Sequence, residues 1–122
     1  MDHDRYPPFS LTIARNDSHT VVALRGELDI VAEGELAAGL ALVLATEPSV
    51  LTVDLRELEF LDSTGLRALL RLRTDTEAIG CRLLLVPGPA AVQRAFEVSG
   101  VSGQFAMVDA SGPPIALQAA VV

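Results

Sequence analysis

The chain has 122 residues, of which half are apolar and only 20% are charged, so we expect one packed globular domain rather than a disordered chain. Aromatic residues make up only 4%, which predicts an aliphatic core. Sixteen acidic residues against nine basic ones give a net charge of −7. This charge argues against binding to nucleic acid or to anionic membranes, and it suits a partner with a basic face.

Several features point to a soluble cytoplasmic protein. Cys81 is the only cysteine, so no internal disulfide is possible and a reducing compartment is expected. The first ten residues lack the basic region and apolar run of a signal peptide. The longest apolar run, residues 36–45, is far shorter than the roughly 20 residues of a membrane-spanning helix. We expect a polar lead-in over residues 1–8 and a single domain over residues 9–122.

The first third of the chain predicts a hairpin followed by a helix. Residues 9–14 alternate between apolar and polar, residues 16–18 form a turn cluster, and residues 20–26 read as a second strand. These two strands should pair antiparallel. Residues 26–29 then close the strand and turn the chain, and a helix is expected over residues 30–46.

The central stretch combines a buried strand with a helix. Residues 50–54 are mostly apolar and end at an aspartate, which predicts a buried strand, and residues 56–59 read as a polar crossing. Asp62 and Ser63 are both preferred helix N-cap types, so the next helix should begin there and end near Gly80. A hydroxyl group would then lie at the positive end of a helix, where an anion is favoured.

The last third continues the alternation of strands and helices. Residues 81–86 predict a buried strand, a third helix should run from Pro89 to Gly100, and residues 105–108 read as a last short strand. Residues 115–122 suit a short helix or a frayed tail. The order predicts an α/β domain whose sheet of about five strands is mixed and mostly parallel, with an antiparallel N-terminal hairpin and three to four helices.

Three motifs in this order carry a family resemblance. Residues 60–66 read Phe-Leu-Asp-Ser-Thr-Gly-Leu, residues 26–29 read Gly-Glu-Leu-Asp, and residues 89–97 are followed by the Ser-Gly of residues 99–100. Together they resemble the STAS family over roughly residues 9–108. More narrowly, they are similar to the anti-sigma factor antagonists of bacterial partner switching.

The resemblance implies a function that is switched by phosphorylation. Ser63 would accept the phosphate, with Thr64 as the second choice. The unphosphorylated protein would bind an anti-sigma factor that is also a serine kinase, which would free a sigma factor, and a serine phosphatase would reset the switch. ATP and magnesium would belong to the kinase, so no cofactor is expected on this chain. The residues expected to contact the partner are Glu27, Asp29, Asp62, Ser63, Thr64, Gly65 and Arg67.

Two of these residues also have plainer interpretations. Ser63 taken alone is most simply a helix cap with no further role. Arg67, together with Arg71, is most simply part of a solvated helix face. The family often has a smaller or uncharged residue at the position of Arg67, so this sequence departs from the pattern there. Because Arg67 follows Ser63 by four residues, it is also able to reach back to a phosphate and partly mask it.

Catalytic and metal-binding alternatives find little support. Carboxylates at strand ends are more often turn and cap residues than metal ligands or acid–base groups. His3 and His19 lie in the lead-in and the hairpin turn, and Cys81 suits a small core residue. The sequence contains no Gly-rich phosphate loop and no His-linked nucleophile, so we expect a substrate of an enzyme rather than an enzyme. The carboxylates in question are Glu27, Asp29, Asp54 and Asp62.

Two other functions remain open from the sequence. One is a non-catalytic STAS subunit of a larger signalling or transport assembly, which would elute as a large oligomer. The other is a module that binds a small ligand or nucleotide, which would show a ligand-dependent rise in thermal stability.

Overall fold

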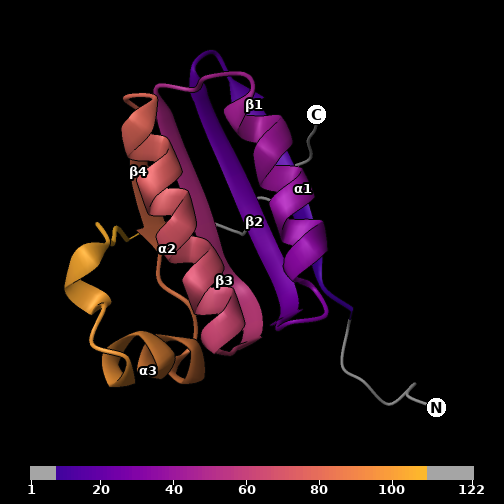
Figure 1. Ribbon diagram of the computed structural model, residues 1–122, viewed down its shortest axis with the longest axis vertical. Helices are drawn as coiled ribbons and strands as arrows, with labels where there is room; N and C mark the ends of the chain where they lie inside the picture. Colours follow the sequence, from indigo (N-terminus) through magenta and orange to yellow (C-terminus); the bar gives the residue numbers. More distant parts are fainter. Residues whose placement is uncertain (1–7, 110–122) are drawn as a thin grey trace.

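A four-stranded sheet in the order β1-β2-β3-β4 organises residues 8–109, the part of the chain that the computed structural model describes. β1 pairs antiparallel with β2, and the other neighbours pair parallel. Helices α1 and α2 lie side by side over one face of the sheet, and α3 lies across one end of it (Figure 1). The predicted α/β class, mixed sheet and N-terminal hairpin are confirmed. The elements are β1 Ser10–Asn16, β2 His19–Leu28, α1 Glu33–Leu44, β3 Val50–Leu61, α2 Ser63–Ala78, β4 Arg82–Val86, α3 Ala90–Val98 and the 3-10 helix η2 Ser102–Gln104.

The core between the helices and the sheet is aliphatic, as the composition predicted. Leu24 of β2, Leu51 of β3 and Leu69 of α2 are fully buried in it. At one end of the core, the rings of Phe96 and Phe105 meet edge to face with centroids 5.4 Å apart. Cys81 is buried beside this core, which confirms its predicted role as a small core residue.

β3 is longer than the sequence predicted. The predicted polar crossing at residues 56–59 is instead the continuation of the strand, which runs as far as Leu61. Its second half pairs with β2 and buries Leu58, and Glu57 makes a salt bridge of 3.0 Å with Arg25 on β2. The polar sequence therefore reflects a cross-strand ion pair at the surface of the sheet rather than a loop.

α1 is shorter than predicted at its N-terminal end. It begins at Glu33 rather than at residue 30, because the Asp29 carboxylate accepts hydrogen bonds from the backbone N–H groups of Val31 and Ala32, at 3.0 and 3.1 Å. An aspartate that bonds the backbone two and three residues ahead holds these residues in a turn.

The predicted fifth strand at residues 105–108 is reduced to one bridge between Leu85 and Met107. Its two hydrogen bonds join Leu85 N–H to the Ala106 carbonyl and Val108 N–H to the Leu85 carbonyl, both at 2.9 Å. Phe105 turns into the core instead of continuing the alternation of a strand. The expected tail at residues 115–122 lies outside the described residues, as does all of the expected lead-in except Pro8. Within residues 8–109, no helix is long and apolar enough to cross a membrane.

Candidate functional site

The candidate site lies where β2 and β3 end side by side. Leu28 is the Cα partner of Leu61 in the parallel pair, and the Asp62 N–H donates to the Leu28 carbonyl at 3.3 Å. Asp29 and Asp62 therefore follow a pair of adjacent residues, one at the end of each strand. The two sequence motifs at residues 26–29 and 60–66, which are more than thirty residues apart in the chain, form one surface at this edge.

Asp62, and not Ser63, caps α2. Its backbone is extended, and its carboxylate accepts the Gly65 N–H at 2.9 Å, three residues ahead. Ser63 is the first helical residue and is exposed. No protein group within residues 8–109 hydrogen-bonds to the Ser63 hydroxyl. The interpretation of Ser63 as the cap is therefore wrong, and its hydroxyl has no structural role among these residues.

Thr64 and Gly65 occupy the first turn of α2 behind Ser63. Thr64 is half-buried, so it is less accessible than Ser63. Gly65 is buried against the end of β2, and a Cβ placed on it would come within 2.8 Å of the Leu28 carbonyl oxygen. Only glycine allows α2 to begin this close to β2.

The strand β2 reaches the site through an irregular segment. The predicted turn at residues 26–29 is a turn only from Asp29 onward, since Gly26 to Leu28 belong to the strand. Register shifts lie on either side of Arg25 and Gly26, and the φ of 87° at Gly26 is one that side-chain-bearing residues rarely adopt. Glu27 is half-buried opposite Phe60 of β3. Asp29 holds the turn into α1 through its bonds to Val31 and Ala32.

The arginines of α2 continue the exposed face that begins at Ser63. Arg67 and Arg71 follow at steps of four residues, and both are exposed. Residues four apart lie on the same side of a helix, so the three side chains form one row. Neither arginine makes an ion pair with another of the described residues.

Three of the four carboxylates considered as metal ligands have clear local roles. Asp62 caps a helix and Asp29 forms a turn, as predicted for acids at strand ends. Asp54 is buried, and its carboxylate forms a salt bridge with the Arg56 guanidinium, with Nη2 at 2.8 Å from Oδ2. This bond raises the pKa of Arg56 above its already high ordinary value. Within residues 8–109, no three His, Cys, Asp or Glu side chains lie together in a way that would hold a metal ion.

His19 and Cys81 lie away from the candidate site. The His19 ring is exposed at the start of β2 and its Nε2 lies 3.0 Å from the Thr52 hydroxyl. Burial raises the pKa of the Cys81 thiol above its ordinary value, although a weaker bond to the Leu51 backbone opposes this. A raised pKa keeps the thiol protonated and unreactive at neutral pH.

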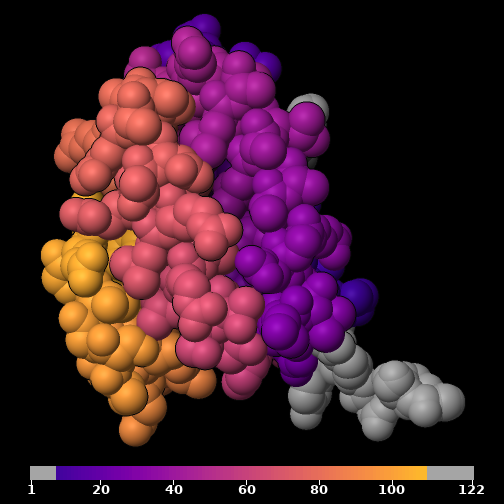
Figure 2. Space-filling view, in the orientation of Figure 1, coloured from indigo at the N-terminus to yellow at the C-terminus, as the bar shows by residue number. Residues whose placement is uncertain are grey.

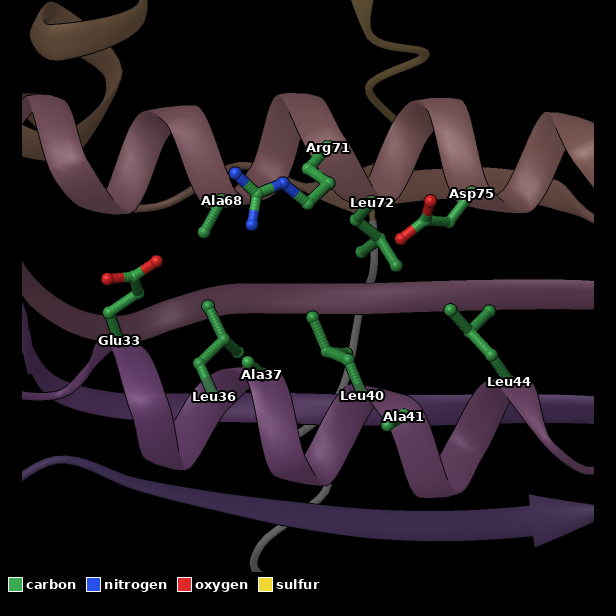
Figure 3. A pocket seen from close by; sticks show the side chains of 10 residues that line it. All are labelled: Glu33, Leu36, Ala37, Leu40, Ala41, Leu44, Ala68, Arg71, Leu72 and Asp75. Atoms are coloured by element: carbon green, nitrogen blue, oxygen red, sulfur yellow. The ribbon is translucent and has the colours of Figure 1, made fainter.

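A shallow groove follows the boundary between α1 and α2 (Figure 2). Its volume is about 170 Å³, and its floor is made of leucine and alanine side chains. Arg71 lies over the floor from α2, while Glu33 and Asp75 stand at its ends (Figure 3). This groove could not be predicted from the sequence, because it depends on how the two helices pack. The carboxylates of Glu33 and Asp75 would repel the phosphates of a nucleotide.

Comparison with known proteins identifies the family of the fold. The family model described as "Mlab, STAS domain" matches residues 11–109. The anti-sigma-F factor antagonist RsfB of Mycobacterium tuberculosis, from strains H37Rv and CDC 1551, is 33% identical over 71 residues. That match covers 58% of this chain and 56% of the relative, so the chain spans little more than half the length of RsfB.

Solved structures extend the likeness over most of the chain. The crystal structure of an anti-sigma factor antagonist from Mycobacterium paratuberculosis matches with a TM-score of 0.76 and 27% identity, covering 87% of this chain and 91% of that one. The anti-sigma factor antagonist SpoIIAA in its unphosphorylated form matches with a TM-score of 0.70 and 26% identity, covering 85% and 89%. The Bacillus cell fate determinant SpoIIAA in its phosphorylated form gives 0.65 and 26%, covering 85% and 92%. With the family model spanning nearly all of the described residues, the chain belongs to the STAS domain family.

Proposed function

We propose that this protein is an anti-sigma factor antagonist whose binding is switched off by phosphorylation at Ser63. One observation carries the proposal: Asp62 caps α2, which leaves the Ser63 hydroxyl exposed and without a partner among the described residues. A kinase is therefore able to modify Ser63 without breaking a cap. The relatives named above as anti-sigma factor antagonists support the same role.

Electrostatics at the helix end explain how one phosphate would act as a switch. A phosphate adds about −1.5 to −2 charges at pH 7. Within the domain the positive end of α2 favours this charge by roughly 0.3–1 kcal/mol. At an interface the same group must lose its water, and it stands beside the carboxylates of Asp29 and Asp62. Phosphorylation should therefore break a complex without unfolding the domain.

Arg67 sets the strength of this switch in our proposal. It lies on the same face of α2 as Ser63, four residues ahead, and makes no ion pair within residues 8–109. A guanidinium at this spacing is able to pair with a phosphate on Ser63 and to neutralise part of its charge. Part of the repulsion toward the partner would then be masked.

The remaining components belong to other proteins in this proposal. The anti-sigma factor would be the serine kinase and would bring ATP and magnesium. A serine phosphatase would restore the binding form. The chain itself would be a regulatory substrate without catalytic activity.

Intact-mass analysis of the protein purified from its own host tests the proposal. We expect a phosphate-sized increment in the wild type and in Thr64→Ala, and no increment in Ser63→Ala. Thr64 is the matched control because it is the neighbouring hydroxyl, half-buried in the same turn. An increment that persists in Ser63→Ala would assign the phosphate elsewhere. A wild type that is unmodified under all growth conditions would contradict the switch.

The two other functions make different predictions. A scaffold subunit would elute as a large oligomer in size-exclusion chromatography, whereas an antagonist should elute as a small particle. A ligand-binding module would gain thermal stability with a small apolar compound that fills the groove between α1 and α2. Either result without any phosphorylation of Ser63 would favour that function over ours.

A further inference from the structure

Two large apolar side chains are displayed at the edge that carries the candidate site. Ile30 and Val31 are 68% and 75% exposed in the turn between β2 and α1. Single exposed apolar residues are common on protein surfaces, but adjacent ones beside a functional site point to an interaction surface. The sequence suggested that both belonged to a helix, so their exposure was not predicted.

The turn that carries this pair is held firmly on both sides. Leu28 before it is fully buried, and Ala32 after it is 5% exposed. Between them, the Ala32 N–H donates to the Asp29 carbonyl at 3.0 Å as well as to the Asp29 carboxylate. The two side chains are thus presented on fixed backbone, which lowers the entropy lost when a partner covers them.

The pair lies on the same edge as Ser63. Ile30 comes two residues after Leu28, Ser63 comes two residues after Leu61, and these two leucines are Cα partners. Both turns leave the sheet at the end where α1 and α2 begin (Figure 1). A partner that covers Ser63 therefore meets the Ile30–Val31 pair next to it.

The charges around the pair define what the partner must offer. Glu27, Asp29 and Asp62 lie at the strand ends, and Glu33 and Glu35 lie in the first turn of α1. An apolar centre with an acidic border is complementary to an apolar recess with a basic border.

We infer that Ile30 and Val31 are the apolar anchor by which the protein binds its anti-sigma factor, seated in a recess that basic side chains border. This inference rests on the proposed function. It explains why a phosphate next to the pair is effective, since the apolar contact excludes the water that a doubly charged group needs. The anchor supplies affinity, and the phosphate at Ser63 makes the same contact unfavourable.

A binding experiment with matched variants tests the anchor. Each anti-sigma factor of the host, purified singly, is titrated with the unphosphorylated full chain, with Ile30→Ser/Val31→Ser, and with Leu42→Ser. Leu42 is the control because it is 70% exposed on α1, about 14 Å along the helix axis from Glu33, the first residue of the helix. We expect the double variant to bind about 100-fold more weakly, roughly tenfold for each side chain, and Leu42→Ser to bind like the wild type.

Two further readouts separate a lost anchor from a damaged fold. Both side chains are exposed, so the thermal unfolding midpoint of the double variant should equal that of the wild type. The affinity that remains should keep the salt dependence of the wild type, because the acidic border is intact, and the loss should appear as faster dissociation.

The outcomes distinguish the anchor from the function on which it rests. Equal binding by the wild type and the double variant would overturn the anchor and leave the proposed function standing. A wild type that binds none of the host's anti-sigma factors would overturn both. A wild type that self-associates through the pair, so that only the double variant is monomeric in sedimentation, would assign the surface to a second copy of the chain and overturn the anchor.

Discussion

At the scale of single residues, neighbours at the start of α2 look interchangeable in the sequence but have different roles in the structure. Asp62 and Ser63 are both good cap types, and only the backbone decides that Asp62 has the capping position. This leaves Ser63 displayed on the surface. Gly65 then lets the helix approach β2. The motif thus contains an aspartate that caps the helix, a serine with an exposed hydroxyl, and a glycine at a position with no room for a side chain.

Replacing the cap should cost stability, whereas replacing the exposed hydroxyl should not. We expect Asp62→Ala to lower the free energy of unfolding by about 1 kcal/mol, because the Gly65 N–H loses its acceptor. Ser63→Ala should stay within about 0.5 kcal/mol of the wild type. Urea unfolding of the two variants measures both values. Equal destabilisation by the two would show that Ser63 shares the cap.

Gly65→Ala should destabilise the fold by about 1–3 kcal/mol, since the new methyl group would overlap the Leu28 carbonyl and the Leu61 side chain. Gly34→Ala is the matched control in α1, because no atom lies within 4 Å of the position a Cβ would take there. That control should match or exceed the wild type, as alanine favours helix. A Gly65→Ala protein as stable as the wild type would contradict the close approach of α2 and β2.

At the scale of elements, the order of strands and helices could be predicted from the sequence, but the ends of elements could not. Apolar periodicity identified the hairpin, the buried strands and the three helices. The predicted end of β3 was too early, because Glu57 looks like a loop residue until its partner Arg25 is known. The predicted start of α1 at residue 30 was too early, because the side chain of Asp29 holds residues 30–32 in a turn. Both differences depend on hydrogen bonds and ion pairs, which periodicity does not reveal.

The burial of Cys81, directly before β4, gives a prediction about pH. Its pKa is raised in the folded state by burial, so the unfolded chain releases the thiol proton at lower pH than the folded one does. The stability from the neutral buried thiol is therefore complete below the ordinary thiol pKa of about 8.5, and is lost as the pH rises above it. We expect the urea midpoint to fall more between pH 7.5 and pH 10 in the wild type than in Cys81→Ala. Identical pH dependence in the two proteins would show that the thiol is not shielded in the fold.

At the scale of the whole molecule, the candidate site exists because the parallel pairing of β2 with β3 brings the ends of the two strands together at one edge of the sheet. The motifs at residues 26–29 and 60–66 could be found in the sequence, and the expectation that they meet followed from the family resemblance. The register of Leu28 with Leu61 now places them together. The exposed pair Ile30 and Val31 could not be found in this way, because two aliphatic residues before a helix look like part of its buried face.

The proposed phosphorylation switch is best tested by titrating the anti-sigma factors of the host with the protein, with and without a phosphate on Ser63. The titration is made without ATP, so that no phosphate is transferred during the measurement. We expect the phosphorylated protein to bind about 100-fold more weakly or worse, which corresponds to about 2.7 kcal/mol or more. Its backbone chemical shifts should change only near Ser63, which would show that the fold is retained. Equal affinity of the two forms would overturn the proposed switch, because phosphorylation of Ser63 would then not control binding.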